Sequence, residues 1–282
     1  MGWFNRGPVV PVLRLSGAIG MAAPLRPGLS IASLAGPIEK AFSMSKAKSV
    51  AVVINSPGGS PVQSNLLFRR IRQLAEEKEK KVYVFCEDVA ASGGYYLAVA
   101  GDEIYADASS IVGSIGVISA SFGLDRAIEK LGISRRVYTA GLNKGALDPF
   151  QPEKADDVER LKAVQRSVHD VFIGVVKDRR LGRLKGPDSE LFSGAFWSAT
   201  EALELGLIDG ISDVRTKMRE LHGENVRLRV VPIERGWLAS RLRRLPSIFG
   251  IAELDGTRQG LAFADDLVSA IEIRALWSRF GL

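Results

Sequence analysis

Apolar runs of strand length alternate with amphipathic helical segments through the first half of this chain. Val50 to Ile54 is a run of apolar, mostly β-branched residues, and Val82 to Cys86 is a second apolar run. Between them, from about Pro61 to Lys78, leucine and isoleucine recur at helical spacing. Strands that lack polar alternation are typically buried on both faces, and their alternation with helices indicates a mostly parallel sheet. The sequence therefore predicts an α/β fold in which helices flank a parallel β-sheet.

Further elements are expected on either side of this unit. We expect strands over 9–15, 103–106, 115–118, 135–139 and 227–232, and helices over 30–44, 93–100, 125–131, 153–176, 200–209 and 214–221. The composition changes after about residue 235, where arginines flank an apolar stripe from Trp237 to Phe249, and a last helix is expected over 261–280. We therefore divide the chain into a domain over 1–235 and a C-terminal amphipathic, helical extension over 236–282.

The composition narrows the classes of function. The chain has 282 residues, a net charge of +6 and one cysteine, Cys86, which excludes an intramolecular disulfide framework. The basic residues have no nucleic-acid-binding motif around them, so we expect no nucleic-acid partner. There is no secretory signal and no run of roughly 18 apolar residues that could span a membrane. The expected location is the cytoplasm, and peripheral contact with the inner face of a membrane is the alternative.

Two glycine-rich turns carry the first chemical signal. Asn55-Ser-Pro-Gly-Gly59 follows one buried strand, and Ala91-Ser-Gly-Gly94 follows the next. In a parallel sheet both turns lie at the carboxyl edge, where sites form. Backbone N–H groups of Gly58, Gly59 and Gly93 could hold a developing oxyanion there, and Ser92 could act as the nucleophile. The plainer alternatives are a turn that only ends a strand and a serine that only caps a helix.

A serine nucleophile requires a base, and the two histidines do not lie in a motif. Lys144, in Asn143-Lys-Gly145, is the candidate base. Lysine side chains titrate near 10.4 in water, so such a base must be shielded from solvent or placed near another positive charge. Because most single lysines are exposed loop residues, the pattern alone leaves this alternative open.

Several motifs occur here in the order in which they occur in a known family. The chain resembles the SppA/SohB-type signal peptide peptidases, which are Ser-Lys serine proteases of the ClpP/crotonase superfamily. The resemblance runs from about Val9 to Asp213 and rests on Ile54–Gly59, Ala91–Tyr96, Gly113–Val117, Asn143–Gly145 with Asp148–Phe150, and Ala202–Asp209.

The resemblance implies a ClpP/crotonase-like fold and assigns roles to particular residues. Ser92 would be the nucleophile, Lys144 the general base, and Gly59 and Gly93 the oxyanion donors. Ser114 would orient the Lys144 amine, although a turn hydroxyl is the plainer interpretation. The resemblance also implies tetrameric or octameric rings, an apolar pocket, and ATP-independent cleavage of extended apolar peptides, such as signal-peptide remnants or fragments of misfolded or membrane proteins. No cofactor or metal is implied.

The peptide is expected to pair as a strand beside Gly58 and residues 115–118. Many members of the family carry an N-terminal membrane anchor, which we do not find here, so the membrane role stays open. The stripe from Trp237 to Phe249 could instead lie at a membrane surface or pack against protein.

Three other functions compete with this interpretation. ClpP uses a similar glycine-rich turn but needs a histidine base, and His169 lies far along the chain in an expected helix. A crotonase-type acyl-CoA enzyme would need an acidic catalyst, and no suitable carboxylate accompanies Gly93 and Gly94. An inactive scaffold of the same fold is the third alternative, against which Ser92 and Lys144 both argue.

Overall fold

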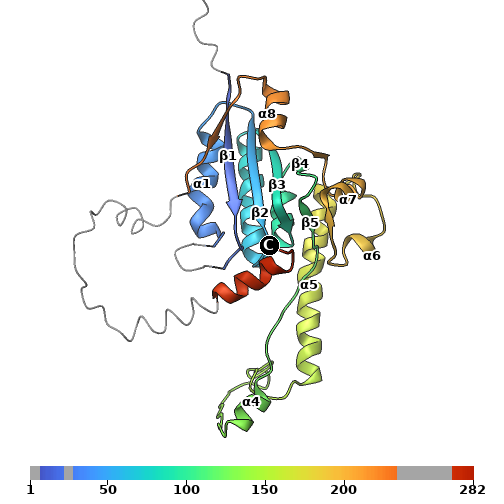
Figure 1. Cartoon of the computed structure of the whole chain (residues 1–282). Coiled ribbons are helices and arrows are strands. Elements are labelled where there is room, and N and C mark those ends of the chain that lie inside the picture. Colours follow the sequence, from blue (N-terminus) through green and yellow to red (C-terminus); the bar gives the residue numbers. More distant parts are fainter. Residues whose placement is uncertain (1–6, 22–27, 234–268) are drawn as a thin grey trace, which may run out of the picture.

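A computed structural model describes residues 7–21, 28–233 and 269–282 (Figure 1). The apolar stripe from Trp237 to Phe249 lies outside these residues, as does most of the predicted extension. Within residues 269–282, the chain is helical over 269–278.

The described strands form one sheet. Its hydrogen-bonded order is β6-β5-β3-β2-β1-β8, and β4 pairs with both β3 and β7. Every pairing is parallel except that of β5 with β6, so the predicted mostly parallel sheet is confirmed. The strands are β1 (Val9–Ser16), β2 (Ser49–Ser56), β3 (Lys81–Ala91), β4 (Glu103–Ala106), β5 (Ile111–Gly113), β6 (Phe196–Ser198), β7 (Gly210–Ile211) and β8 (Arg227–Val230).

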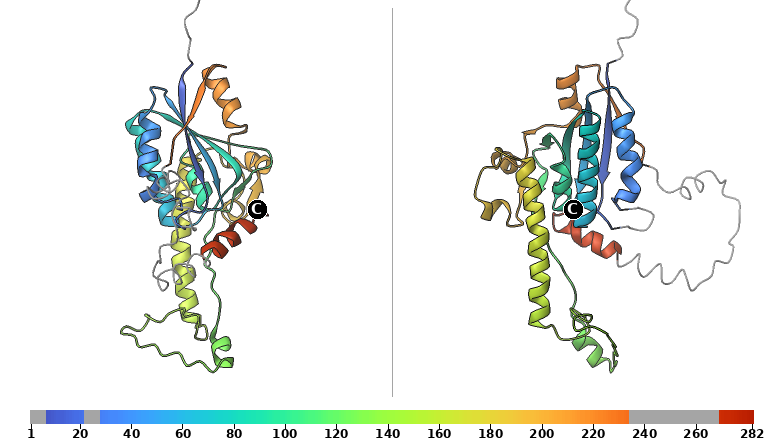
Figure 2. Two further views of the ribbon diagram at one scale, coloured as in Figure 1. Left: turned by 60° about the vertical axis from the view of Figure 1, so that its left-hand side comes forward. Right: turned by 180° about the vertical axis from the view of Figure 1, so that it is seen from behind.

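Helices cover both faces of this sheet (Figures 1 and 2). The larger core joins one face to α1, α2, α3, α5 and α7. On the other face, Met218 of α8 packs against strand residues, and Phe280 packs against Val89 and Ala91 of β3. The helices are α1 (Ile31–Ser43), α2 (Pro61–Glu77), α3 (Gly93–Ala98), α4 (Asp125–Lys130), α5 (Ala155–Arg179), α6 (Asp188–Leu191), α7 (Ala199–Glu204) and α8 (Val214–His222).

Two predicted strands are wrong. Residues 115–118 and 135–139 are not in any strand, and the sheet strand in this region is the shorter β5 at Ile111–Gly113. Both segments contain the β-branched residues that favour strands, but neither pairs with a neighbouring strand within the described chain. A strand needs such a neighbour, and local composition cannot supply one.

The strand-to-helix turns at the carboxyl edge are held by backbone hydrogen bonds. Ile19, just beyond β1, donates its N–H to the carbonyl of Gly58 at 2.8 Å and accepts from the N–H of Ser60 at 2.8 Å. Ser60 then caps α2 by accepting from the N–H of Gln63 at 3.4 Å. Two hydrogen bonds to Ile19 therefore hold the glycine turn after β2 in place before α2 begins.

A long projection, residues 117–154, leaves the body between β5 and α5, and we call it the arm. It extends away from the sheet together with the first half of α5 (Figures 1 and 2). Only Phe172 and Val176 of α5 are buried, both in its second half. Within the arm, Arg135 contacts Asp148 at 3.1 Å and lies over the ring of Phe150 at 4.6 Å. The arm thus has contacts of its own but few with the body.

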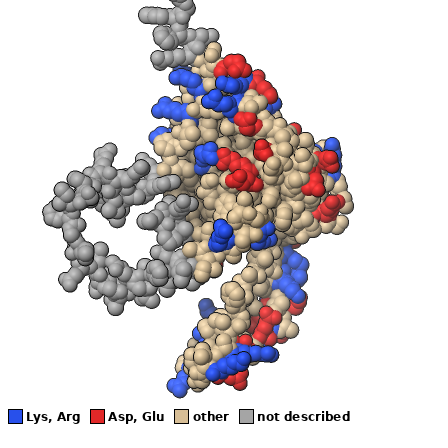
Figure 3. Space-filling view, viewed as in Figure 1, with Lys and Arg blue, Asp and Glu red and all other residues tan. Residues whose placement is uncertain are grey.

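Positive and negative side chains are interspersed over the face seen in Figure 3. Arg14 pairs with Glu87 at 2.6 Å, for example, and Lys177 pairs with Asp188. The net positive charge is therefore not gathered into one continuous basic surface on that face.

Candidate active site

Ser92 has an unusual backbone conformation. It joins β3 to α3 with a φ of 52° and a ψ of −121°. A positive φ is uncommon for a residue other than glycine, and strain of this kind costs about 1–3 kcal/mol. The N–H of Ser92 donates to the carbonyl of Gly113 at 2.8 Å, and its carbonyl accepts from Tyr96 at 2.9 Å. Its hydroxyl does not cap α3, so the side chain is left free for another partner.

The two glycine-rich turns are in contact. A methyl group built on Gly58 would lie 2.8 Å from both the nitrogen of Gly93 and the Cβ of Ser92. One built on Gly93 would lie 3.3 Å from the nitrogen of Gly59. Gly58 and Gly59 have φ values of 103° and 143°, which favour glycine. The turns therefore approach too closely for side chains at these positions.

Two amide groups at this contact point to an anion-binding role. Among the hydrogen bonds of the described residues, the N–H groups of Gly59 and Gly93 have no acceptor. Gly93 is the first residue of α3, where a helix leaves its N–H groups unpaired. The N–H of Gly58, in contrast, donates to the hydroxyl of Ser56 at 3.2 Å. Gly59 and Gly93 are thus better placed to bind an oxyanion than Gly58.

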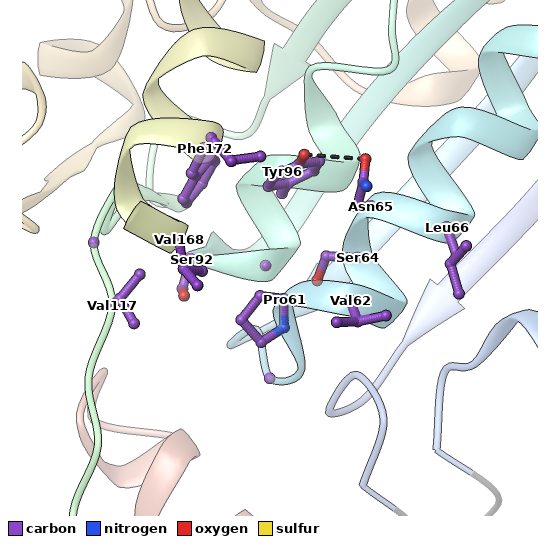
Figure 4. A pocket seen from close by; sticks show the side chains of 14 residues that line it. Pro61, Val62, Ser64, Asn65, Leu66, Ser92, Tyr96, Val117, Val168 and Phe172 are labelled. Carbon is purple, nitrogen blue, oxygen red and sulfur yellow. Dashed lines mark hydrogen bonds between the residues drawn. The ribbon is translucent and has the colours of Figure 1, made fainter. Parts of the chain in front are cut away.

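A mostly apolar cavity of about 230 Å³ opens beside Ser92 (Figure 4). This volume is below the roughly 300–1,000 Å³ of pockets that hold drug-sized ligands, and it suits one side chain better than a cofactor. The hydroxyl of Tyr96 donates to Asn65 at 3.2 Å within the lining. The side chains lining the cavity are Pro61, Val62, Ser64, Asn65 and Leu66 of α2, Ser92, Tyr96 of α3, Val117, and Val168, Val171 and Phe172 of α5.

Ser114 lies close to Ser92, to which it is joined through a backbone hydrogen bond of its neighbour Gly113. It is buried, has a φ of 52°, and follows Gly113, whose carbonyl accepts from Ser92. Its own N–H donates to the carbonyl of Ala195 at 2.7 Å. The structure therefore fixes the backbone of Ser114 next to that of Ser92, whereas Lys144 lies in the exposed turn after Gly141.

Lys144 does not join Ser92 within one copy of the chain. It is exposed in a turn of the arm, where its N–H donates to the carbonyl of Gly141 at 3.2 Å. It is absent from the lining of the cavity beside Ser92. The structure thus brings together Gly58, Gly59, Ser92 and Gly93, and it leaves the predicted base outside this group.

Several residues of the site were not predicted as such. Ser64 of α2 is buried, and its hydroxyl lies where a methyl group on Gly93 would approach it to 2.5 Å. Val168 and Phe172 of α5 line the cavity, and His169 between them bonds to the carbonyl of Ile115 at 2.9 Å. The sequence holds no local signal for these contacts, because they join segments far apart in the chain.

Cys86 is a buried strand thiol, as its apolar surroundings predicted. Burial raises its pKa to about 12, so it stays protonated near neutral pH and is a poor nucleophile. In the ranges that the structure describes, His, Cys, Asp and Glu side chains do not gather in groups of three or more that could hold a metal ion. Within the same ranges, no helix is both long and apolar enough to cross a bilayer.

Relatives of this chain carry names of two kinds. The Na(+)/H(+) antiporter NhaA of Brucella abortus is 54% identical over 97% of the chain, which covers 37% of that protein. Serine protease SPPA of Arabidopsis thaliana, a chloroplast protein, is 34% identical over 71% of the chain and 32% of its own length. Protease 4 of Haemophilus influenzae is 30% identical over 62% of the chain and 28% of its length. The chain thus spans about a third of these relatives.

A family profile gives the most direct assignment. The profile of Peptidase family S49 matches residues 74–227, a range that contains Ser92, Ser114 and Lys144. The match begins after the turn at Gly58 and Gly59, so these two glycines are placed by the structure alone. The α/β sheet with its flanking helices is consistent with the ClpP/crotonase-like fold that the motifs implied. This chain belongs to Peptidase family S49, the family of serine peptidases that includes SppA and protease IV.

Proposed function

We propose that this chain is a serine endopeptidase in which Ser92 attacks the peptide carbonyl and Lys144 acts as the general base. The observation that carries the proposal is the strained Ser92 beside two amide donors at the mouth of an apolar cavity. Attack by the serine hydroxyl moves negative charge onto the carbonyl oxygen. The N–H groups of Gly59 and Gly93 would stabilise that charge, and such donors are worth roughly 2.7–4 kcal/mol each.

The cavity supports a preference for apolar side chains. Its walls come mainly from aliphatic and aromatic residues of α2 and α5, such as Leu66, Val168 and Phe172. A peptide bond held over Ser92 would place the preceding side chain in this cavity, away from water. Substrates are therefore extended peptides with an apolar residue at the cleavage position, and their natural source stays a prediction. Cytoplasmic location, and peripheral contact with a membrane, also stay predictions.

Within one copy of the chain, Lys144 lies outside the cavity beside Ser92, so the base must come from another copy. We propose that a neighbouring copy inserts the arm and brings its Lys144 to Ser92. The arm also carries large exposed apolar side chains: Phe122 is 83% exposed, Tyr138 is 91% exposed and Leu142 is fully exposed. Exposed apolar groups of this kind commonly mark protein interaction surfaces. A homo-oligomer, a tetramer or an octamer, would cover them and complete each site at once.

Single substitutions test the dyad. Ser92→Ala and Lys144→Ala should each lower kcat for an apolar peptide by roughly 10⁴-fold or more, because members of a catalytic dyad act as a unit. The matched control is Lys130→Ala, which removes another exposed lysine from the arm and should leave kcat unchanged. Full activity in Lys144→Ala would reject the assigned base.

Co-expression of the two inactive variants tests donation between copies. An assembly that contains both Ser92→Ala and Lys144→Ala chains has some sites with an intact serine from one chain and an intact lysine from another. Such assemblies should regain part of the activity, whereas each variant alone has none. Mixed assemblies that stay inactive would contradict donation between copies, even if both residues prove essential.

A further inference from the structure

Residues 113–117 form one wall of the cavity. Besides the pairing of Gly113 within the sheet, three hydrogen bonds hold this segment in place. The carbonyl of Gly113 accepts from the N–H of Ser92 at 2.8 Å, and the N–H of Ser114 donates to Ala195 at 2.7 Å. The third is the bond between Nε2 of His169 and the carbonyl of Ile115, at 2.9 Å. Only this third bond uses a side chain, so a substitution can remove it without changing the backbone.

Beyond Ile115, residues 116–123 make no hydrogen bond within the described chain. The next hydrogen bond along the sequence joins the N–H of Leu124 to the carbonyl of Pro149. Gly116 and Val117 fall inside this interval, and both line the cavity beside Ser92. Ile115, which precedes them, is fully buried. The position of this wall therefore depends on what holds Ile115.

His169 also joins this wall to the part of the cavity lining that α5 supplies. It lies on α5 between Val168 and Phe172, and Val168 lies next to Val117 in the lining (Figure 4). The ring of Phe172 packs against that of Tyr96 at 4.9 Å between centroids, which fixes this part of α5 on the body. The bond from His169 to Ile115 thus sets the distance between α5 and the segment after β5 that leads into the arm.

The direction of this bond assigns a role to the imidazole. A carbonyl oxygen can only accept, so Nε2 of His169 must carry a proton and donate it. That nitrogen therefore cannot take a proton from Ser92, and His169 itself does not line the cavity beside Ser92. We propose that His169 is a positioning residue that holds Gly116 and Val117 in place in the wall of the substrate cavity and thereby sets its preference for large apolar side chains. This inference rests on the proposed peptidase function.

Three variants of the full-length chain test the role. His169→Leu removes the hydrogen-bond donor. His169→Asn keeps an amide group, but on a side chain that is too short to reach the carbonyl of Ile115. His169→Gln places an amide nitrogen near the position of Nε2. The readout is the ratio of kcat/KM for two peptides that differ only in leucine or alanine at the cleavage position. One lost hydrogen bond should lower this ratio roughly 2- to 10-fold in the leucine and asparagine variants. His169→Gln should restore it.

The chain provides a matched control. His222 also makes one hydrogen bond through Nε2, to the hydroxyl of Ser49 at 3.0 Å, and it ends α8 away from the cavity lining. His222→Leu should leave the ratio unchanged, although it removes the same kind of group. A ratio equal to that of wild type in folded His169→Leu or His169→Asn would overturn the inference.

Hydrogen exchange gives a readout that does not need activity. The amides of Ser92 and Ser114, which donate to Gly113 and Ala195, should exchange faster in His169→Asn than in wild type or His169→Gln, whereas those of α2 should not change. Equal rates at Ser92 and Ser114 would contradict the role of His169. If the wild-type protein cleaves none of the peptides, the proposed function is contradicted. The exchange comparison would still show whether the bond from His169 holds the cavity wall.

Discussion

At the scale of single residues, the contact between Gly93 and Ser64 is a tight constraint on the site. A methyl group on Gly93 would lie 2.5 Å from the Ser64 hydroxyl and 3.3 Å from the nitrogen of Gly59. Gly93→Ala should therefore push the two turns apart and misplace both amide donors. Loss of one such donor costs about 10²–10³-fold in kcat, and we expect a decrease of that order in steady-state peptide cleavage.

Removing the Ser64 hydroxyl should relieve this contact in part. The double variant Gly93→Ala/Ser64→Ala is expected to have a higher kcat than Gly93→Ala alone. Gly36→Ala is the control, because a methyl group at this position in α1 meets no atom within 4 Å and should leave activity unchanged. A Gly93→Ala enzyme with wild-type kcat would show that the amides are not used as proposed.

At the scale of elements, Arg180 joins the end of α5 to the loop after α7. Its side chain is almost fully buried; Nη1 contacts Asp209 at 2.7 Å, and Nε and Nη2 donate to the carbonyl of Gly206 at 2.9 and 2.6 Å. Arg180→Ala would leave the partly buried carboxylate of Asp209 without its shortest ion-pair contact. Breaking a buried pair costs about 3–5 kcal/mol, so we expect the free energy of unfolding in denaturant to fall by up to that amount.

Arg183 offers a comparison on the same carboxylate. Its side chain is 44% exposed and contacts Asp209 at 3.3 Å. Exposed pairs contribute about 0–1 kcal/mol, so Arg183→Ala should change the free energy of unfolding by no more than that. Equal losses in the two variants would mean that burial does not distinguish these arginines.

The prediction of elements from sequence succeeded where the residues of a single segment determine the element. The apolar runs at Val50 to Ile54 and Val82 to Cys86 are strands β2 and β3, and Ser30 caps α1 as expected. It failed at 115–118 and 135–139, where β-branched residues lack a neighbouring strand. Pairing joins distant parts of the chain, and a single sequence does not record it.

The candidate site was predictable to a similar extent. The glycine turns and Ser92 follow buried parallel strands, so their meeting at one edge follows from topology. Lys144 has no such constraint, because the arm is joined to the body only at its two ends. The contact of His169 with Ile115 depends on how α5 crosses the sheet, which hydrophobic periodicity does not determine.

At the scale of the complete fold, residues 269–282 return to β3, the strand that ends just before Ser92. Phe280 is 8% exposed, packs against Val89 and Ala91 of β3, and meets the ring of Phe196 at 5.2 Å between centroids. Phe280→Ala should destabilise the folded chain, by at most the 3–5 kcal/mol typical of such a change in a core. Thermal unfolding measures this effect.

Ile271 lies in the helix over 269–278 that precedes Phe280, and it is 60% exposed. Ile271→Ala is therefore the control and should leave the unfolding temperature almost unchanged. If Phe280→Ala behaves like this control, the C-terminal helix does not support the sheet in solution. A loss confined to Phe280→Ala would show that residues 269–282 belong to the folded body.

Gly116 and Val117 take part in both the cavity and the arm, since they form a wall of the cavity and the arm begins at Val117. In the proposed oligomer, a ligand that fills the cavity and a second subunit that binds the arm would then act on the same few backbone angles. Thermodynamic reciprocity requires that if association tightens peptide binding, peptide binding tightens association by an equal factor. A peptide-like inhibitor would consequently also hold the assembly together.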